Sequence, residues 1–466
     1  MEESLTYDVI IIGSGCSGSA IANELTREGV SCLMLEAGKH HKKEQLPLNP
    51  IDSFGQMTWG GGLEMDTTFR NAVMRGKGVG GGTVVYQAIM YRFDEYVYEF
   101  WREKSGISDF TVEKMQPWYE KAEALLSISQ QDERYKTECA RIFHDGLTKL
   151  GFQPKIEMRA QKNCHWDKGN DCIECYGGCK INGKQGMPDT VLKSALKQGL
   201  KLIPEFEVKK IEEKSEGWMV HGEYRGNKRF SFNCRKLVLG AGPLGNIKLL
   251  EDSGFKKRLP SLGQNFYVHT QWTHFGLFDQ IVDAHKGVLM YYGCTDTKCR
   301  EMGIKFENIF MSPAILADFY PGYGRNHQEI MRKYRHLSCI ESAVQGRNPG
   351  SVKFDKNGIP IIDIGFTDED KKREKYAAEV AHNVLYKEGA KEVVTSPFSI
   401  CPHHFGGLNL GVDGETSCID PEFRLHGFRN LYCADSSAFP ASCGLNPALT
   451  ILALSIKASQ NILKEV

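Results

Sequence analysis

A glycine-rich turn close to the N-terminus constrains the fold more than any other feature of the sequence. The apolar run YDVIII is typical of a buried strand, and it leads directly into Gly13, Gly15 and Gly18 with the spacing G-x-G-x-x-G. Residues 19–29 then have apolar side chains at helical spacing. In such a turn the first glycine permits the bend, the second lets the backbone approach a pyrophosphate, and the third lets helix and strand pack closely. The helix N-terminus would point its free N–H groups at the phosphates.

A carboxylate follows this turn at the position that a dinucleotide site requires. Glu36 ends the second predicted strand, VSCLMLE, and lies 18 residues after Gly18. A carboxylate at this place can accept hydrogen bonds from ribose hydroxyls. A glycine-rich turn without a ligand would not explain this carboxylate. The sequence therefore predicts dinucleotide binding, although this motif alone does not separate FAD from NAD.

Length and charge exclude several classes of function. A chain of 466 residues is too long for one typical domain and predicts two or three lobes. Lys plus Arg equals Asp plus Glu at 58 each, so no overall field attracts nucleic acid or an anionic membrane. The longest uncharged apolar stretches have about half the length that a membrane span needs. Fifteen cysteines without a secretory signal pattern favour a reducing, cytoplasmic location.

Local signals place further elements along the chain. RKLVLGAG (235–242) is typical of a buried strand, and GNIKLLEDSG then predicts a short helix. A longer helix is expected to begin at TDED, where Thr367 can cap it and Asp370 occupies the capping-box position. Aromatic segments with a period of two in 260–400 predict a separate sheet. A strand in RNLYCADSS and a final helix from NPALT end the chain.

Four segments resemble one family, the glucose–methanol–choline (GMC) oxidoreductases. RGKGVGGGTVVYQAIMYR (75–92) is similar to the family's flavin-side loop, R-G-K-x-x-G-G-x-S/T. In this resemblance Gly80 and Gly81 match the paired glycines that lie against the flavin, and Thr83 matches the hydroxyl position. Tyr86 stands where the family has asparagine. The other three segments are LVLGAGPLGNIKLL (237–250), CPHHFGGLNLG (401–411) and RLHGFRNLYCADSSAFPASCGLNPALT (424–450).

The resemblance implies an α/β fold with two unequal parts. One is a Rossmann-like FAD-binding domain, and the other is a substrate-binding domain built on a mostly antiparallel sheet. The implied division gives 1–100, 185–258 and 401–466 to the FAD domain, 101–184 to a helical, Cys-rich insertion and 259–400 to the substrate domain. The form of the GVGGG loop looks closest to the branch that contains cholesterol oxidase and bacterial dehydrogenases. The FAD contacts implied beyond the two glycine-rich turns are Ala241, Asp435 and Pro447.

Oxidation of an alcohol by a flavin needs a base, because the hydroxyl proton must leave as the hydride is given up. Histidine suits this role, since its ordinary pKa lies near the operating pH. In the family the base is the histidine that opens H-x-x-G-x-x-x-x-G, and this pattern falls on His403. The second active-site position of the family falls on Asn446, which would hold the substrate oxygen. His269 also occupies a recurrent family position, for which we expect a structural role.

A cluster of cysteines suggests a second redox centre. Cys164, Cys172, Cys175 and Cys179 have the spacing C-x7-C-x2-C-x3-C, in which a tight turn can bring thiolates together. A 4Fe–4S or 3Fe–4S cluster is the leading interpretation, and zinc or free thiols are the alternatives. An iron–sulfur cluster would pass electrons from the reduced flavin to a redox protein or quinone.

The resulting hypothesis is an FAD-dependent dehydrogenase or oxidase that acts on the CH–OH group of a small alcohol, sugar or sterol. Two other functions stay open at this stage. The same fold can host a flavin-containing lyase or decarboxylase, and fold alone does not determine chemistry. The chain could also be an electron-transfer flavoprotein subunit that never binds a small substrate.

Overall fold

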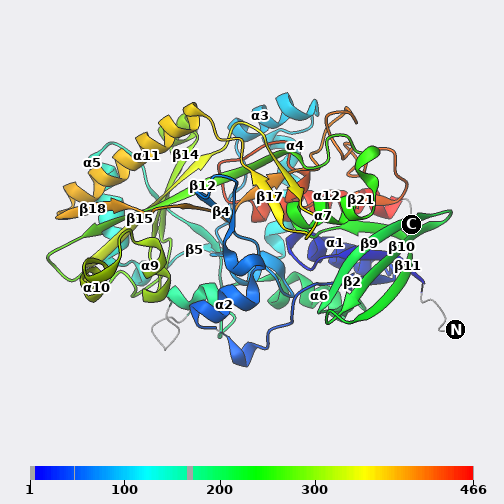
Figure 1. Cartoon of the computed structure of the whole chain (residues 1–466), viewed down its shortest axis with the longest axis horizontal. Coiled ribbons are helices and arrows are strands. Elements are labelled where there is room, and N and C mark those ends of the chain that lie inside the picture. The colour runs from blue at the N-terminus through cyan, green and yellow to red at the C-terminus, as the bar shows by residue number, and fades with distance from the viewer. Residues whose placement is uncertain (1–5, 47, 165–171, 465–466) are drawn as a thin grey trace.

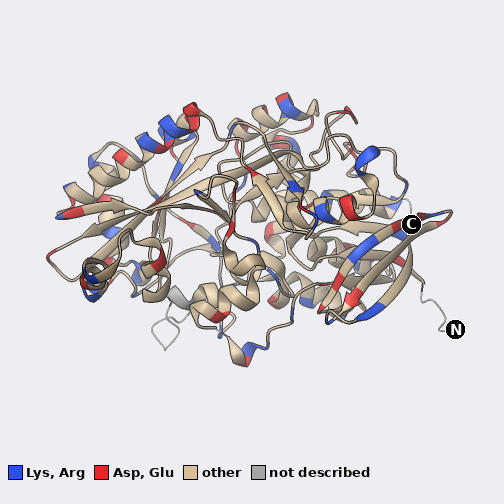
Figure 2. Ribbon diagram, viewed as in Figure 1, with Lys and Arg blue, Asp and Glu red and all other residues tan. Residues whose placement is uncertain are grey.

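The protein contains two large sheets that lie side by side along its longest axis (Figure 1). The computed structural model describes residues 6–46, 48–164 and 172–464, without the side chains of 172–174. Residues of both charges, Lys and Arg as well as Asp and Glu, are distributed along the ribbon (Figure 2), in keeping with the balanced composition. None of the helices in these ranges is long and apolar enough to cross a membrane.

The smaller sheet has the order β8-β2-β1-β11-β10-β9, and β21 pairs with the C-terminal part of β11. Its parallel strands are β1 (Thr6–Ile12), β2 (Cys32–Leu35), β8 (Lys201–Ile203), β11 (Lys228–Leu239) and β21 (Leu431–Cys433). The antiparallel strands are β9 (Phe206–Lys214) and β10 (Gly217–Tyr224). The strand, turn, helix and strand predicted at the N-terminus are therefore confirmed.

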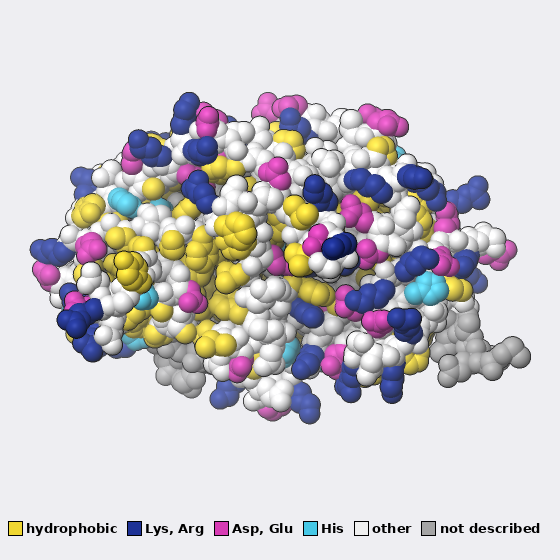
Figure 3. Space-filling view, viewed as in Figure 1, with side chains coloured by type: hydrophobic (Ala, Val, Ile, Leu, Met, Phe, Trp, Pro, Cys, Tyr) yellow, Lys and Arg dark blue, Asp and Glu magenta, His cyan; other side chains and the backbone are white. Residues whose placement is uncertain are grey.

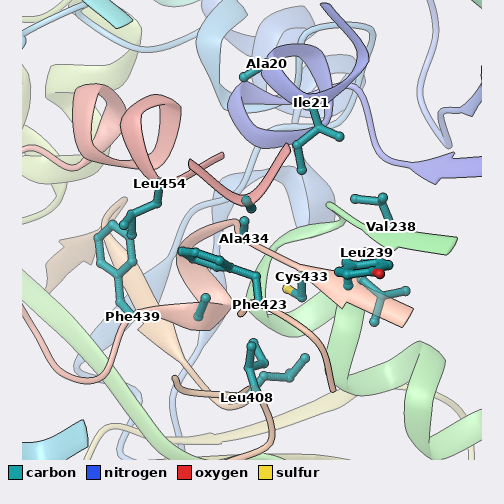
Figure 4. Packing of buried hydrophobic residues seen from close by; sticks show 14 of the residues in the cluster. Ala20, Ile21, Val238, Leu239, Leu408, Phe423, Cys433, Ala434, Phe439 and Leu454 are labelled. Carbon is teal, nitrogen blue, oxygen red and sulfur yellow. The ribbon is translucent and has the colours of Figure 1, made fainter. Parts of the chain in front are cut away.

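Helices pack on this sheet and bury its apolar side chains. α1 (Cys16–Arg27) packs on β1 and β2, and α7 (Gly242–Asp252) packs on β9, while α6 (Val191–Lys197) and α12 (Ala448–Lys464) pack on α1. The first and the last helix of the chain, α1 and α12, pack against each other. Figure 4 shows Ile21 of α1 and Leu454 of α12 in one cluster with Leu239 of β11 and Phe439, all of them buried. This core closes the smaller sheet with pieces from both ends of the chain.

The larger sheet has the order β3-β4-β19-β12-β15-β14-β13-β6. Its pairs are antiparallel except for β4 with β19. These strands are β3 (Glu64–Met65), β4 (Asn71–Val73), β6 (Lys155–Ile156), β12 (Gln264–Leu277), β13 (Tyr292–Cys294), β14 (Ile304–Ile309), β15 (Leu337–Gln345) and β19 (Ser399–Cys401). Four more strands join it, namely β16 (Gly350–Phe354), β17 (Pro360–Asp363), β18 (Glu392–Thr395) and β20 (His404–Gly406). The predicted fold class, a Rossmann-like α/β domain beside a mostly antiparallel sheet, is confirmed.

The longest helix, α11 (Asp368–Lys387), packs on β12 and β15. Thr367 caps it and Asp370 completes the capping box, as predicted. The remaining elements are α2 (Pro50–Met57), α3 (Glu95–Ser105), α4 (Val112–Ala124), α5 (Glu138–Lys149), α8 (Thr297–Met302), α9 (Pro313–Phe319), α10 (Gly324–Arg332), β5 (Ile128–Gln130) and β7 (Met158–Ala160). The predicted domain boundaries stay a prediction, and the larger sheet also takes strands from outside 259–400.

Candidate active site

A cavity of about 1530 Å³ lies between the two sheets. It exceeds the roughly 300–1,000 Å³ that usually encloses one small ligand, so it has room for a dinucleotide together with a substrate. Figure 3 shows hydrophobic side chains gathered near the middle of one face, and the exposed side chains of Leu63, Phe69 and Ile359 line the cavity. Each of the four segments that resemble the flavin signatures contributes residues to the lining of this cavity. Of the glycines predicted to contact the cofactor, Gly13, Gly15 and Gly81 line it, whereas Gly18 and Gly80 lie behind the lining.

The first glycine turn leaves no room for side chains at two of its three positions. Gly13 has a φ of +96°, and a Cβ atom there would lie 2.3 Å from the carbonyl oxygen of Gly240. A Cβ on Gly18 would lie 2.0 Å from the carbonyl oxygen of Gly13. Gly15 instead lines the cavity and has no heavy atom within 4 Å of an added Cβ. This open space in front of a helix N-terminus fits a pyrophosphate.

Glu36 is buried at the edge of the cavity and organises the two glycine-rich turns. Its carboxylate accepts hydrogen bonds from Ser14 Oγ at 2.7 Å, Ser14 N at 3.0 Å and Gly38 N at 2.8 Å. Ser14 Oγ in turn accepts from Gly80 N at 2.9 Å. Burial raises the pKa of Glu36, and these hydrogen bonds oppose the rise. Ser14 was not among the predicted site residues, and it occupies a variable position of the G-x-G-x-x-G motif.

The second glycine turn packs directly on the first. Gly80 and Gly81 have φ angles of +101° and +55°, and a Cβ on Gly81 would lie 2.9 Å from the Cα of Gly15. Thr83 lines the cavity, but its Oγ1 donates to the Gly80 carbonyl at 2.6 Å and accepts from Met187 N at 3.0 Å. Its hydroxyl therefore stabilises the turn. Tyr86, which replaces the family's asparagine, also lines the cavity.

Asp435 joins the segment 424–450 to the segment 237–250. Its carboxylate accepts from Gly242 N at 2.8 Å, Asn246 Nδ2 at 2.9 Å and Ser437 N at 2.8 Å. Burial raises the pKa of Asp435, and the hydrogen bonds again oppose the rise. Ala241, Asp435 and Pro447 all line the cavity, as their predicted contacts with the cofactor require. The backbone cradle, the two buried carboxylates and the size of the cavity fit FAD.

His403 lines the same cavity and is partly buried. Burial, followed by the positive charge of Lys305 and the neighbouring His404, lowers its pKa to about 3. The imidazole is therefore neutral at pH 7 and has a lone pair available. Its Nδ1 has no hydrogen-bond partner within the described part of the chain. The imidazole beside the cavity is thus neutral, which is the state that a proton acceptor requires.

Asn446 lines the cavity at the N-terminus of α12 and is held by a buried lysine. Lys305 Nζ donates a hydrogen bond to Asn446 Oδ1. The same ammonium group lies 2.7 Å from Glu307 Oε1 and 3.7 Å from Glu157 Oε1. Because the amide oxygen is occupied, the NH₂ group of Asn446 is left to donate to a substrate. Lys305 was not among the predicted site residues, although its alternation with Glu307 in IKFENI places two polar side chains on one face of a strand.

His269 supports the loop that precedes Asn446. Its Nε2 accepts a hydrogen bond from Gly444 N at 2.7 Å, and its ring centroid lies 5.5 Å from that of His403. Burial holds the pKa of His269 well below its usual value, which keeps Nε2 able to accept. These contacts agree with the structural role that we expected.

The cysteine cluster does not form a metal site from its described members. Cys164, Cys175 and Cys179 are buried, and the side chain of Cys172 lies outside the described residues. Among the described residues, the one group of three candidate ligands within 4.8 Å of one another is Cys294, Asp296 and Cys299. Asp296 in that group already accepts hydrogen bonds from Cys299 N at 3.0 Å and Gln153 N at 2.9 Å. The four-cysteine centre therefore stays a prediction.

Known proteins match this chain over most of its length. The family model described as GMC oxidoreductase matches residues 7–271 with its N-terminal part and 347–455 with its C-terminal part. Cholesterol oxidase of Mycobacterium tuberculosis is 25% identical over 97% of this chain and 90% of its own length. The long-chain-alcohol oxidase FAO4B of Arabidopsis thaliana is 24% identical over 98% of this chain and 67% of its own length.

Solved structures with low sequence identity share the fold. Pyridoxine 4-oxidase from Mesorbium loti superposes with a TM-score of 0.79 at 15% identity, over 98% of this chain and 99% of that protein. Formate oxidase from Aspergillus oryzae gives a TM-score of 0.75 at 14% identity, over 100% of this chain and 99% of that one. With the family model matching well over half of its residues, the chain belongs to the GMC oxidoreductase family and has the flavin-binding fold of that family.

Proposed function

We propose that this protein is an FAD-dependent enzyme that removes a hydride from the CH–OH group of an alcohol. One observation carries the proposal: a neutral, partly buried imidazole and an oriented amide line the same cavity as the glycine cradle for the dinucleotide. The named substrates of two relatives, cholesterol and long-chain alcohols, are themselves alcohols. Sugars and sterols fall within the same reaction class.

The cofactor would be held mainly by backbone. Gly13 would permit the turn, Gly15 would let the backbone approach the pyrophosphate, and Gly18 would let α1 pack closely on β1. Glu36 would bind the ribose, and the second turn would lie against the flavin. Bound FAD supplies the hydride acceptor.

His403 and Asn446 have different roles at the substrate oxygen. The neutral imidazole of His403 takes the hydroxyl proton, which lets electron density move to the carbon as its hydride departs. The NH₂ group of Asn446 donates to the same oxygen and holds it beside the base. Lys305 fixes the orientation of that amide, and its positive charge favours negative charge on the substrate oxygen. The organic product is a carbonyl compound.

Anaerobic flavin reduction tests this proposal directly. Purified FAD-loaded enzyme should lose its flavin absorption when an alcohol substrate is added without oxygen. His403→Ala should keep its FAD yet reduce about 10²–10⁴-fold more slowly, because general-base help is worth this much. His382→Ala is the control, since His382 lies on α11, bonds Thr395 and does not line the cavity. Near-normal reduction in His403→Ala would remove His403 from the role of base.

The same experiment separates the alternative functions. A lyase or decarboxylase would form product with its flavin absorption unchanged. An electron-transfer subunit would show neither product nor bleaching with any alcohol, and would be reduced only by a protein donor.

The path of the electrons after reduction is a separate proposal. Cys164, Cys172, Cys175 and Cys179 would hold an iron–sulfur cluster that delivers electrons to a redox protein or quinone. The burial of Cys164, Cys175 and Cys179 supports this proposal. Their sulfur atoms do not all lie within 4.8 Å of one another, however, as the ligands of a single metal centre would. Iron, sulfide and zinc analysis of protein purified without oxygen tests it. Cys175→Ser should then slow acceptor reduction and leave flavin reduction by the substrate unchanged.

A further inference from the structure

Two buried cysteines lie close together on the substrate side, outside the cavity assigned to FAD and substrate. Cys294 ends β13, and Cys299 lies in the first turn of α8. Their sulfur atoms are 3.7 Å apart, and both residues are fully buried. A disulfide needs an S–S distance of about 2.0 Å, so these are two separate thiols. Neither residue is among those that line the cavity, and the proposed oxidation does not use them.

A carboxylate joins the two thiols. Asp296 lies between them in the run C-T-D-T-K-C (294–299). A carboxylate oxygen of Asp296 and the sulfur atoms of Cys294 and Cys299 all lie within 4.8 Å of one another. The connection from β13 to α8 is therefore a single short loop that directs three metal-ligating side chains to one place.

The separation of the two sulfur atoms is the one that a tetrahedral metal ion requires. Two thiolates, each about 2.3 Å from a zinc ion and at a tetrahedral angle, lie about 3.8 Å from each other. Cys294 Sγ and Cys299 Sγ already have nearly this separation. Two sulfur atoms and one carboxylate oxygen suit a divalent ion of the zinc class. The fourth position would take water, since Asp296 is only partly buried.

Two backbone N–H groups orient the carboxylate. Asp296 Oδ1 accepts from Cys299 N at 3.0 Å, and Oδ2 accepts from Gln153 N at 2.9 Å. Each carboxylate oxygen keeps further lone-pair capacity beside such a bond. Carboxylates that bind metals are commonly hydrogen-bonded in this way, because the bonds fix the ligand. These contacts therefore leave Asp296 able to coordinate an ion.

The loop also connects to the substrate site. Cys299 is followed by Arg300, whose guanidinium donates to the carbonyls of Cys443 and Gly444 at 3.3 Å. These carbonyls belong to the loop that precedes Asn446. An ion that joins the end of β13 to α8 would therefore also stabilise the support of Asn446, without contact with the substrate.

We propose that Cys294, Cys299 and Asp296 bind one divalent ion of the zinc class through two thiolates and one carboxylate oxygen. In the structure Cys299 Sγ donates its proton toward Cys294 Sγ, and the ion would take the place of this proton. Both thiol protons pass to the solvent on binding, and no electron is transferred. The inference goes beyond the proposed oxidation, and the four cysteines of the predicted iron–sulfur cluster take no part in it.

Titration of the FAD-loaded, thiol-reduced protein with Co²⁺ tests this site. Tetrahedral Co²⁺ with thiolate ligands absorbs at longer wavelengths than oxidised flavin, so a difference spectrum reports the donors directly. We expect one equivalent to bind with two thiolate ligands, and Zn²⁺ to displace it.

Three variants each remove one ligand: Cys294→Ser, Cys299→Ser and Asp296→Asn. Each should weaken Co²⁺ binding by at least about 100-fold, because loss of an outer hydrogen-bond partner alone costs about 10–100-fold in metal affinity. Cys175→Ser is the matched control, since it alters a buried cysteine of the other cluster and should leave Co²⁺ binding unchanged.

Several outcomes would overturn the site. One is the failure of the reduced protein to bind an equivalent of Co²⁺. Another is binding that persists in the variants of Cys294 and Cys299 but is lost in Cys175→Ser, because the ion would then occupy the other cluster. Should the cysteine variants not fold, the spectrum of the unaltered protein decides: two thiolate ligands support the site, and four contradict it. Flavin reduction by alcohols is measured separately, so failure of the metal site leaves the proposed oxidation standing.

Discussion

The two sides of the cavity differ in which part of the chain forms their surface, backbone or side chains. On the nucleotide side, backbone makes the surface: Gly13, Gly18 and Gly81 stand where a Cβ would lie within 3 Å of another backbone atom. On the substrate side, long side chains make the surface, and Lys305 and Glu341 are both nearly inaccessible to solvent. A backbone surface tolerates almost no change in volume, whereas a side-chain surface can keep its shape and change its charge. Variants on the first side should therefore alter cofactor retention, and variants on the second should alter rate and specificity.

The largest effect is expected from Gly18→Ala. Its Cβ would lie 2.0 Å from the carbonyl oxygen of Gly13, and neither backbone segment can move without separating α1 from β1. We expect little folded protein, and no bound FAD in what folds, as measured by flavin absorption after gel filtration. Gly15→Ala should fold but hold FAD weakly, because its Cβ would enter the open space for the pyrophosphate. Gly55→Ala is the control, since nothing lies within 4 Å and an alanine in the helix α2 is favourable. Normal FAD content in Gly18→Ala would contradict the steric argument.

A smaller but still large effect is expected from Lys305→Met on the substrate side. Loss of the ammonium frees the amide of Asn446 to rotate, so flavin reduction should slow by about 10²-fold, the usual cost of one oriented donor. Lys305 also lowers the pKa of His403, so without it the imidazole should take up its proton at a higher pH. The acid limb of the reduction rate should consequently move to higher pH, as measured by stopped-flow absorption.

Two comparisons show whether this effect is specific. The double variant of Lys305→Met and Asn446→Ala should be little slower than Asn446→Ala alone, because both changes remove the same donor. Lys236→Met is the control, since this buried lysine bonds the Ile462 carbonyl on the nucleotide side. An acid limb that does not move in Lys305→Met would show that the lysine serves packing alone.

The contrast between the two sides also explains which parts of the site the sequence could predict. The glycine turns and Glu36 follow one another within a short segment, so their spacing alone indicates their geometry. Lys305, Glu307 and Glu341 meet only through the register of β12, β14 and β15, and no local pattern encodes that register. The positions of His403 and Asn446 were predicted through family resemblance. The contacts that tune them, especially Lys305, depend on pairing between distant strands.

A fall in pH should destabilise the protein mainly through histidines on the substrate side. Burial lowers the pKa of His274 and His403 to about 3 and that of His404 to about 4, against about 6.5 in an unfolded chain. As the pH falls from 6.5 toward 4, the unfolded chain binds protons that the folded protein excludes. The free energy of unfolding therefore decreases below pH 6.5, by about 1.4 kcal/mol per pH unit for each such histidine. The melting temperature should fall steeply below pH 6.5, and less steeply in His274→Gln. A flat profile would show that these histidines take up protons in the folded protein.

The smallest effect is expected from Thr367→Ala, which alters backbone capping on the substrate side without touching the cavity. Thr367 Oγ1 accepts from Asp370 N at 3.3 Å, and Asp370 Oδ2 accepts from Thr367 N at 2.9 Å. Removal of the hydroxyl should cost about 1 kcal/mol in the free energy of unfolding, measured by urea denaturation. The rate of flavin reduction should stay unchanged, because the start of α11 holds none of the residues that line the cavity. Thr367→Ser keeps the hydroxyl and should restore the stability. If Thr367→Ala also slowed reduction, the side chains of β12 and β15 that line the cavity would depend on the position of α11. The substrate side would then tolerate less backbone change than a surface made of side chains implies.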